Sequence, residues 1–92
     1  MTLYIVSYDI TDTSRRTKIS NILKDFGERV QYSVFECLMD SKLRGKMVER
    51  LKSIIKAEED SIRIYTLCVG CEKNIEVIGQ GELTKEDKYY IL

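Results

Sequence analysis

The chain of 92 residues contains no histidine, no proline and no tryptophan. The absence of histidine excludes a Ser-His-Asp triad, a Cys-His nucleophile pair and any zinc site that uses imidazole. Because no proline, repeat or low-complexity linker interrupts the chain, we expect one continuous folded domain. The formal net charge is zero, so no bulk field draws the protein to nucleic acid or membrane, and anion binding would need a local basic patch.

Long apolar runs are also missing, and the longest runs have the length of a strand. With no signal peptide or membrane-spanning stretch in view, the default expectation is a cytoplasmic protein without membrane contact. Cys37, Cys68 and Cys71 are an odd set and a poor disulfide framework. The 43% hydrophobic and 33% charged residues are typical of a folded soluble domain, one small enough to gain stability from oligomerisation.

The first half of the chain predicts a strand, a helix and two further strands. Residues 3–10 alternate as in a strand and are largely apolar on both sides. Asp12 to Ser14 offer N-cap chemistry for a helix that ends at Gly27, a natural C′ residue. Residues 29–39 are too long and too rich in β-formers for one typical strand, so we expect a break near 31–33.

The second half predicts a helix capped by Asp40 and Ser41, a strand at 61–69, a short strand at 75–79 and a polar tail at 80–92. The resulting fold class is α+β, with a ferredoxin-like β-α-β-β-α-β order and an extra C-terminal strand. Both helices would then pack on one face of an antiparallel sheet.

The other face of that sheet needs a cover. It would carry side chains that are too apolar for full exposure, namely Leu3, Ile5, Tyr32 and Tyr65. We therefore expect a homodimer that stacks sheet on sheet.

Asp9 ends the first predicted strand and has two interpretations. Aspartate is common where a strand ends, so the residue can simply begin the turn to the helix, and the local pattern alone favours this. In the second interpretation Asp9 binds a metal, because Mg²⁺ takes oxygen ligands and often needs only one or two carboxylates. Two such aspartates, brought together across a dimer axis, would be adequate.

Arg15 and Arg16 lie in the first turn of the predicted helix, where the helix dipole disfavours cations. Two arginines at this end suggest an anion that they and the helix N–H groups bind together, although a solvated polar face is the ordinary alternative. Because Asp9 is a few residues away, the cluster suggests metal-assisted chemistry on a phosphodiester.

The stretch FGERVQYSVFE (26–36) adds further candidates. Arg29 suits phosphate, and Tyr32 and Phe35 suit stacking on bases, although ordinary strand packing explains the two aromatic residues better. The polar face of 42–56 is basic, which indicates a solvated helix face or, second, a non-specific phosphate-binding surface.

The CVGC stretch (68–71) is a C-x-x-C. A redox motif would place its first cysteine at a helix N-terminus, whereas this pair follows a predicted strand. Zinc would need four ligands, and three cysteines without histidine fall short unless chains share a site. We therefore expect a buried Cys68 and an incidental Cys71.

In combination, YIVSYDITD (4–12), the RR pair and FGERVQYSVFE resemble the family of small CRISPR-associated endoribonucleases, whose members also form the central dimer of the spacer-acquisition complex. The resemblance covers most of the chain. It implies a ferredoxin-like homodimer in which the C-terminal strand, here 75–79 and the residues after it, pairs onto the partner's sheet. We accordingly assign 1–79 to the domain and 80–92 to a tail that packs on the partner subunit.

The resemblance further implies a metal-dependent endonuclease acting on single-stranded RNA or double-stranded DNA in prokaryotic antiviral defence. Asp9 falls on the family's metal-binding position, so it would be the catalytic residue that holds Mg²⁺ or another divalent cation. The positions implied for nucleic-acid binding are Tyr8, Arg15, Arg16, Arg29, Ser33 and Phe35. Which of Arg15 and Arg16 matches the family's basic position stays open.

A competing hypothesis is non-catalytic. The same dimer would join two dimers of the integrase subunit and hold duplex DNA along its basic edges, and Asp9 would then be dispensable. A third hypothesis, from the fold alone, is a small-ligand sensor, which the absence of a glycine-rich ligand loop makes weaker.

Overall fold

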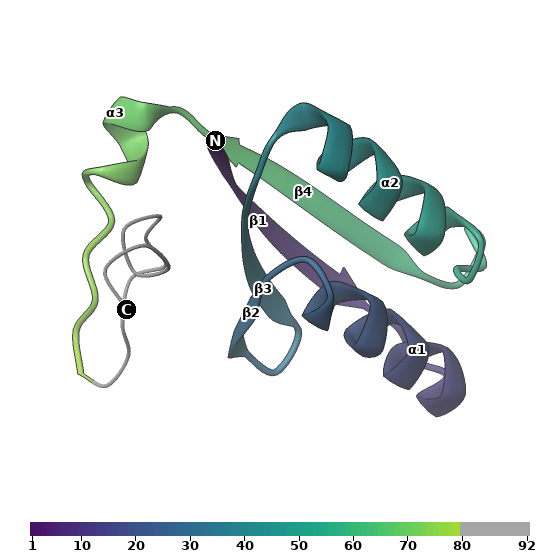
Figure 1. Cartoon of the computed structure of the whole chain (residues 1–92). Coiled ribbons are helices and arrows are strands. Elements are labelled where there is room, and N and C mark those ends of the chain that lie inside the picture. Colours follow the sequence, from purple (N-terminus) through teal and green to yellow (C-terminus); the bar gives the residue numbers. More distant parts are fainter. Residues whose placement is uncertain (80–92) are drawn as a thin grey trace.

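A four-stranded antiparallel sheet organises residues 1–79, the part of the chain that the computed structural model describes. Its strands, in spatial order, are β2 (Glu28–Gln31), β3 (Val34–Met39), β1 (Thr2–Asp9) and β4 (Ser61–Leu67). The helices are α1 (Thr13–Lys24), α2 (Ser41–Lys52) and the short α3 (Val69–Glu72). Figure 1 shows α1 and α2 next to each other on one side of the sheet. The ferredoxin-like β-α-β-β-α-β order is thus confirmed.

Local signals set the starts of the two long helices, as predicted. The Asp12 side chain accepts a hydrogen bond from the Arg15 N–H at 2.9 Å, and Asp40 accepts one from the Leu43 N–H at 2.8 Å. Each aspartate therefore satisfies an N–H group that the helix itself leaves without a partner. The predicted break in 29–39 is confirmed as well, because residues 32 and 33 form the turn between β2 and β3.

Gly27 occupies a different role from the one predicted. Helix α1 ends at Lys24, Asp25 is its C-cap, and Gly27 does not adopt the left-handed conformation of a C′ glycine. Instead, Gly27 lies against β3, where an added Cβ would be 2.2 Å from the Glu36 carbonyl oxygen and 2.6 Å from Cys37 Sγ. The position requires glycine because the backbone approaches a neighbouring strand closely.

The hydrophobic core lies between the helices and one face of the sheet. Alternate residues of β1 and β3 point into it, as the period of a strand requires. Its buried members include Tyr4, Val6, Tyr8, Ile19, Leu23, Phe35, Cys37, Met39, Met47 and Leu51. Each large apolar side chain that is fully buried contributes about 2 kcal/mol relative to exposure.

The opposite face of the sheet, here called the open face, is also partly apolar. The strand register aligns Ile5 with Tyr65, and it aligns Leu3 with Leu38 on one side and Leu67 on the other. Leu3 is buried within the chain, whereas Tyr65 is half exposed. Such a face favours a covering partner, in line with the expected dimer.

The strand predicted at 75–79 does not form within this chain. After β4, helix α3 turns the backbone, and residues 75–78 adopt no regular structure. A strand needs a neighbour for its N–H and C=O groups, and none of the four described strands pairs with this segment. Ile78 consequently remains 90% exposed. The predicted tail at 80–92 lies outside the described residues.

Within residues 1–79, no helix combines the length and the apolar character needed to cross a bilayer.

Candidate functional site

Asp9 is the last residue of β1, and its side chain is exposed. It pairs in register with Ser61, the first residue of β4, and alternation places it on the open face together with Ile5. An accessible carboxylate is a suitable ligand for a hard divalent cation. Residues 1–79 bring no group of three or more potential metal ligands together, so a metal held by Asp9 would need ligands from elsewhere.

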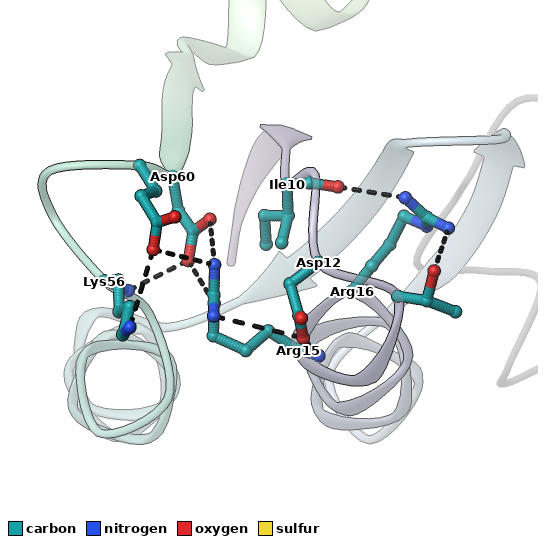
Figure 2. A network of polar contacts seen from close by, with 8 residues as sticks. Ile10, Asp12, Arg15, Arg16, Lys56 and Asp60 are labelled. Carbon is teal, nitrogen blue, oxygen red and sulfur yellow. Dashed lines mark hydrogen bonds and ion pairs between the residues drawn. The ribbon is translucent and has the colours of Figure 1, made fainter.

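Arg15 is held by acidic residues of its own chain, as Figure 2 shows. Its Nε donates to Asp60 Oδ2 at 2.8 Å and its Nη2 to Asp60 Oδ1 at 3.2 Å, a bidentate pair. The carboxylate of Asp60 is fully buried, and it also accepts the Lys56 N–H at 2.9 Å. Arg15 therefore ties the start of α1 to the turn before β4.

The charges of this pair stabilise each other. The hydrogen bond from Arg15, followed by that from the Lys56 amide, holds the pKa of Asp60 below its usual value. The same contact with Asp60 raises the pKa of Arg15. Sequence reasoning missed Asp60, because nothing local to Arg15 indicates a partner 45 residues away.

Arg16 points away from this network in Figure 2. Its Nη1 donates to the Ile10 carbonyl oxygen at 3.0 Å and its Nη2 to Thr13 Oγ1 at 3.2 Å. Both acceptors are neutral, no acidic residue in 1–79 pairs with Arg16, and the side chain is exposed. The guanidinium of Arg16 is therefore held at the backbone of the residue that directly follows Asp9, and no acid within residues 1–79 compensates its positive charge.

Tyr8 of β1 and Phe35 of β3 are buried, and Ser33, in the turn before β3, is partly buried next to them. The Tyr8 hydroxyl donates to the Tyr32 carbonyl oxygen at 3.1 Å, and the Tyr8 N–H donates to the Ser33 carbonyl oxygen at 3.0 Å. The Phe35 ring is fully buried, with its centroid 6.4 Å from that of Tyr8. Phe35 therefore presents no free face on which a base could stack.

Arg29 and Tyr32 are the accessible members of the same region. The guanidinium of Arg29 lies 5.4 Å from the centroid of Phe35, in a cation–π arrangement, and also donates to Ser20 Oγ. Tyr32 is 94% exposed at the turn, where both residues line an open groove on β2. Ordinary strand packing, which the sequence favours for both aromatic residues, therefore holds for Phe35 but not for Tyr32, and the place of Tyr32 at the predicted break was the signal for its exposure.

Cys68 is exposed, so the prediction of a buried Cys68 is wrong. The strand ends at Leu67, one residue before it, and Cys68 becomes the N-cap of α3. Its sulfur accepts the Cys71 N–H at 3.2 Å.

Comparisons with a family model and with related proteins point to the same family. Residues 1–75 match the family model described as CRISPR associated protein Cas2. The CRISPR-associated endoribonuclease Cas2 3 of Synechocystis sp. is 41% identical, covering 92% of each chain. The CRISPR-associated endonuclease Cas2 2 of Thermus thermophilus is 40% identical, covering 98% of this chain and 96% of that protein.

Solved structures agree. The crystal structure of Streptococcus pyogenes Cas2 superposes with a TM-score of 0.74 at 32% identity, covering 84% of this chain and 99% of that one. A chain of a partial Cas6-RT-Cas1–Cas2 complex gives a TM-score of 0.72 at 34% identity, covering 85% of this chain and 91% of that one.

Proposed function

This chain belongs to the CRISPR-associated protein Cas2 family, and from that premise we propose that it is a divalent-metal-dependent endonuclease that takes part in spacer acquisition. Its substrates are phosphodiester bonds of single-stranded RNA or double-stranded DNA. The observation that carries the proposal is the exposed carboxylate of Asp9 at the end of β1, on the open face of the sheet. The names of the relatives, endoribonuclease and endonuclease, support the reaction class.

The proposed metal site is shared by two chains. Asp9 is a single oxygen ligand, and a sheet-to-sheet homodimer would bring the same residue of a second copy toward it across the two-fold axis. The donor set fits Mg²⁺ or a similar cation, which takes carboxylate oxygens and keeps several waters. When bound, such a cation lowers the pKa of water and offsets negative charge on the phosphate.

Arg16 is the proposed phosphate ligand of the helix start, because no acid within residues 1–79 compensates its charge, whereas the charge of Arg15 is neutralised by Asp60. Arg29 holds the nucleic-acid backbone at the groove on β2, and the exposed ring of Tyr32 stacks on a base. Tyr8, Ser33 and Phe35 act indirectly, by fixing the turn that presents these two side chains.

The test compares Asp9→Asn with wild type for Mg²⁺-dependent cleavage of RNA and of duplex DNA. We expect the variant to lose activity by more than about 100-fold, since even residues that only support metal ligands cost about 10–100-fold. Glu58→Gln is the matched control, because Glu58 is exposed on the turn before β4 and should be dispensable. All three proteins are purified in the same way, and each is checked for contaminating nuclease before its cleavage is compared. Undiminished, Mg²⁺-dependent cleavage by Asp9→Asn would disprove the assignment.

A second candidate function rests on the structural likeness to a chain of the Cas1–Cas2-containing complex. In this role the dimer is a non-catalytic scaffold that joins integrase subunits and holds duplex DNA. Lysines on α2 without an ion-pair partner in 1–79, Lys42, Lys46 and Lys52, would contribute to that surface. An integration assay with Asp9→Asn separates the two functions: full integration by a variant that does not cleave favours the scaffold.

A further inference from the structure

Cys68 and Cys71 form a pair of exposed thiols on one turn of the chain. The Cys71 N–H already lies 3.2 Å from Cys68 Sγ, so the backbone has brought the two residues into contact range. Neither sulfur is part of a disulfide, and all three cysteines of the chain are free thiols. Neither thiol belongs to a three-ligand metal cluster within residues 1–79.

We propose that Cys68 and Cys71 are a redox-active dithiol, which small disulfides such as oxidised glutathione convert into an intrachain disulfide. The C-x-x-C spacing and the N–H···S contact carry the proposal, because they bring two exposed cysteines together on one turn. It is independent of the proposed nuclease site, which uses neither cysteine.

The two thiols are not equivalent. Hydrogen bonds from the Cys71 side chain and then its amide to the Cys68 sulfur lower the pKa of Cys68, and the same contact raises the pKa of Cys71. Cys68 is therefore the attacking residue and Cys71 the resolving one. The third thiol serves as the comparison, because Cys37 is fully buried and burial raises its pKa to about 11.

The exchange proceeds in two balanced steps. The Cys68 thiolate attacks one sulfur of the oxidised glutathione, forms a mixed disulfide and releases one glutathione thiolate, which takes a proton. The Cys71 thiol then loses its proton and attacks Cys68 Sγ, which releases the second glutathione. The protein loses two electrons and two protons, and one disulfide molecule becomes two thiols.

The experiment uses the full chain, reduced and then incubated with excess oxidised glutathione. Cys68 and Cys71 lie in a single tryptic peptide, 64–73, because cleavage follows Arg63 and Lys73. We expect this peptide to lose the mass of two hydrogens and to regain it with dithiothreitol. Cys37 should stay unlabelled by iodoacetamide until the protein is unfolded, which also reports that the fold is intact.

The matched variants Cys68→Ser and Cys71→Ser cannot form the intrachain bond. Each should instead gain one glutathionyl group, with circular dichroism spectra like that of wild type, since both positions are exposed. Limiting iodoacetamide should label Cys68 of wild type several-fold faster than Cys71. Stable mixed disulfides on wild type, a disulfide between chains, or two thiols that stay reduced would each overturn the proposal. Faster labelling of Cys71 would overturn the assignment of Cys68 as the attacking residue.

Discussion

Arg15 and Arg16 are adjacent and chemically identical, yet their surroundings give them different tasks. The reasoning from the helix dipole assigned both to an anion, and for Arg15 the anion is the buried carboxylate of Asp60. Arg16 is oriented by two neutral oxygens, and no acidic residue of the described part of the chain compensates its charge. The sequence could not separate them, because Asp60 comes near Arg15 only once β4 pairs with β1.

This difference predicts opposite outcomes for Arg15→Gln and Arg16→Gln. Arg15→Gln leaves a buried carboxylate without its cation, so we expect the melting temperature at neutral pH to fall by several degrees. Arg16→Gln should leave the melting temperature nearly unchanged but weaken binding to duplex DNA. The slope of the logarithm of the association constant against the logarithm of salt concentration should become shallower by the share of about one phosphate contact. Differential scanning fluorimetry and a salt titration of DNA affinity measure the two effects. A reduced salt dependence in the Arg15 variant alone would reverse the assignment.

At the scale of elements, the sequence predicted what short-range chemistry decides. The aspartate caps, the turn at 32–33 and the strand–helix order follow from neighbouring residues, and the structure has them. The position of Asp9 at the end of β1 was also predictable, whereas a metal there stays a prediction. The segment 75–79 was predicted as a strand because its residues favour one, but a strand forms only with a neighbour, and no strand within residues 1–79 pairs with it.

Gly27 was identified from sequence for the wrong reason, and the correct reason gives a prediction. In Gly27→Ala the new Cβ would meet backbone atoms of β3 that cannot move aside, so we expect a loss of about 1–3 kcal/mol in the free energy of unfolding. Gly45→Ala is the control: nothing lies within 4 Å of its added Cβ, and alanine should stabilise α2 by about 0.5–1 kcal/mol. Urea denaturation of both variants measures the difference. A Gly27→Ala variant as stable as wild type would contradict the close approach.

At the scale of the whole molecule, the two faces of the sheet are unequal. Helices α1 and α2 cover one face, whereas the open face carries Ile5 and the half-exposed Tyr65. Figure 1 shows the segment after α3 leading down the side of the molecule away from α1 and α2. That segment exposes Val77 and Ile78. A second copy that accepts this segment at a sheet edge would cover apolar surface and supply its missing hydrogen-bond partners.

The expected homodimer can therefore be tested at Ile78, whose side chain is 90% exposed in the single chain. Ile78→Lys places a charge where the partner's sheet would receive an apolar side chain, so we expect the dimer dissociation constant to rise by about tenfold or more. Leu43→Lys is the control, because Leu43 is also exposed but lies on α2, on the helical side of the sheet. Sedimentation velocity over a range of concentrations measures both variants. If Ile78→Lys dimerises as tightly as wild type while Leu43→Lys dissociates, the interface lies on the helices, and Asp9 of two chains cannot meet across the open face.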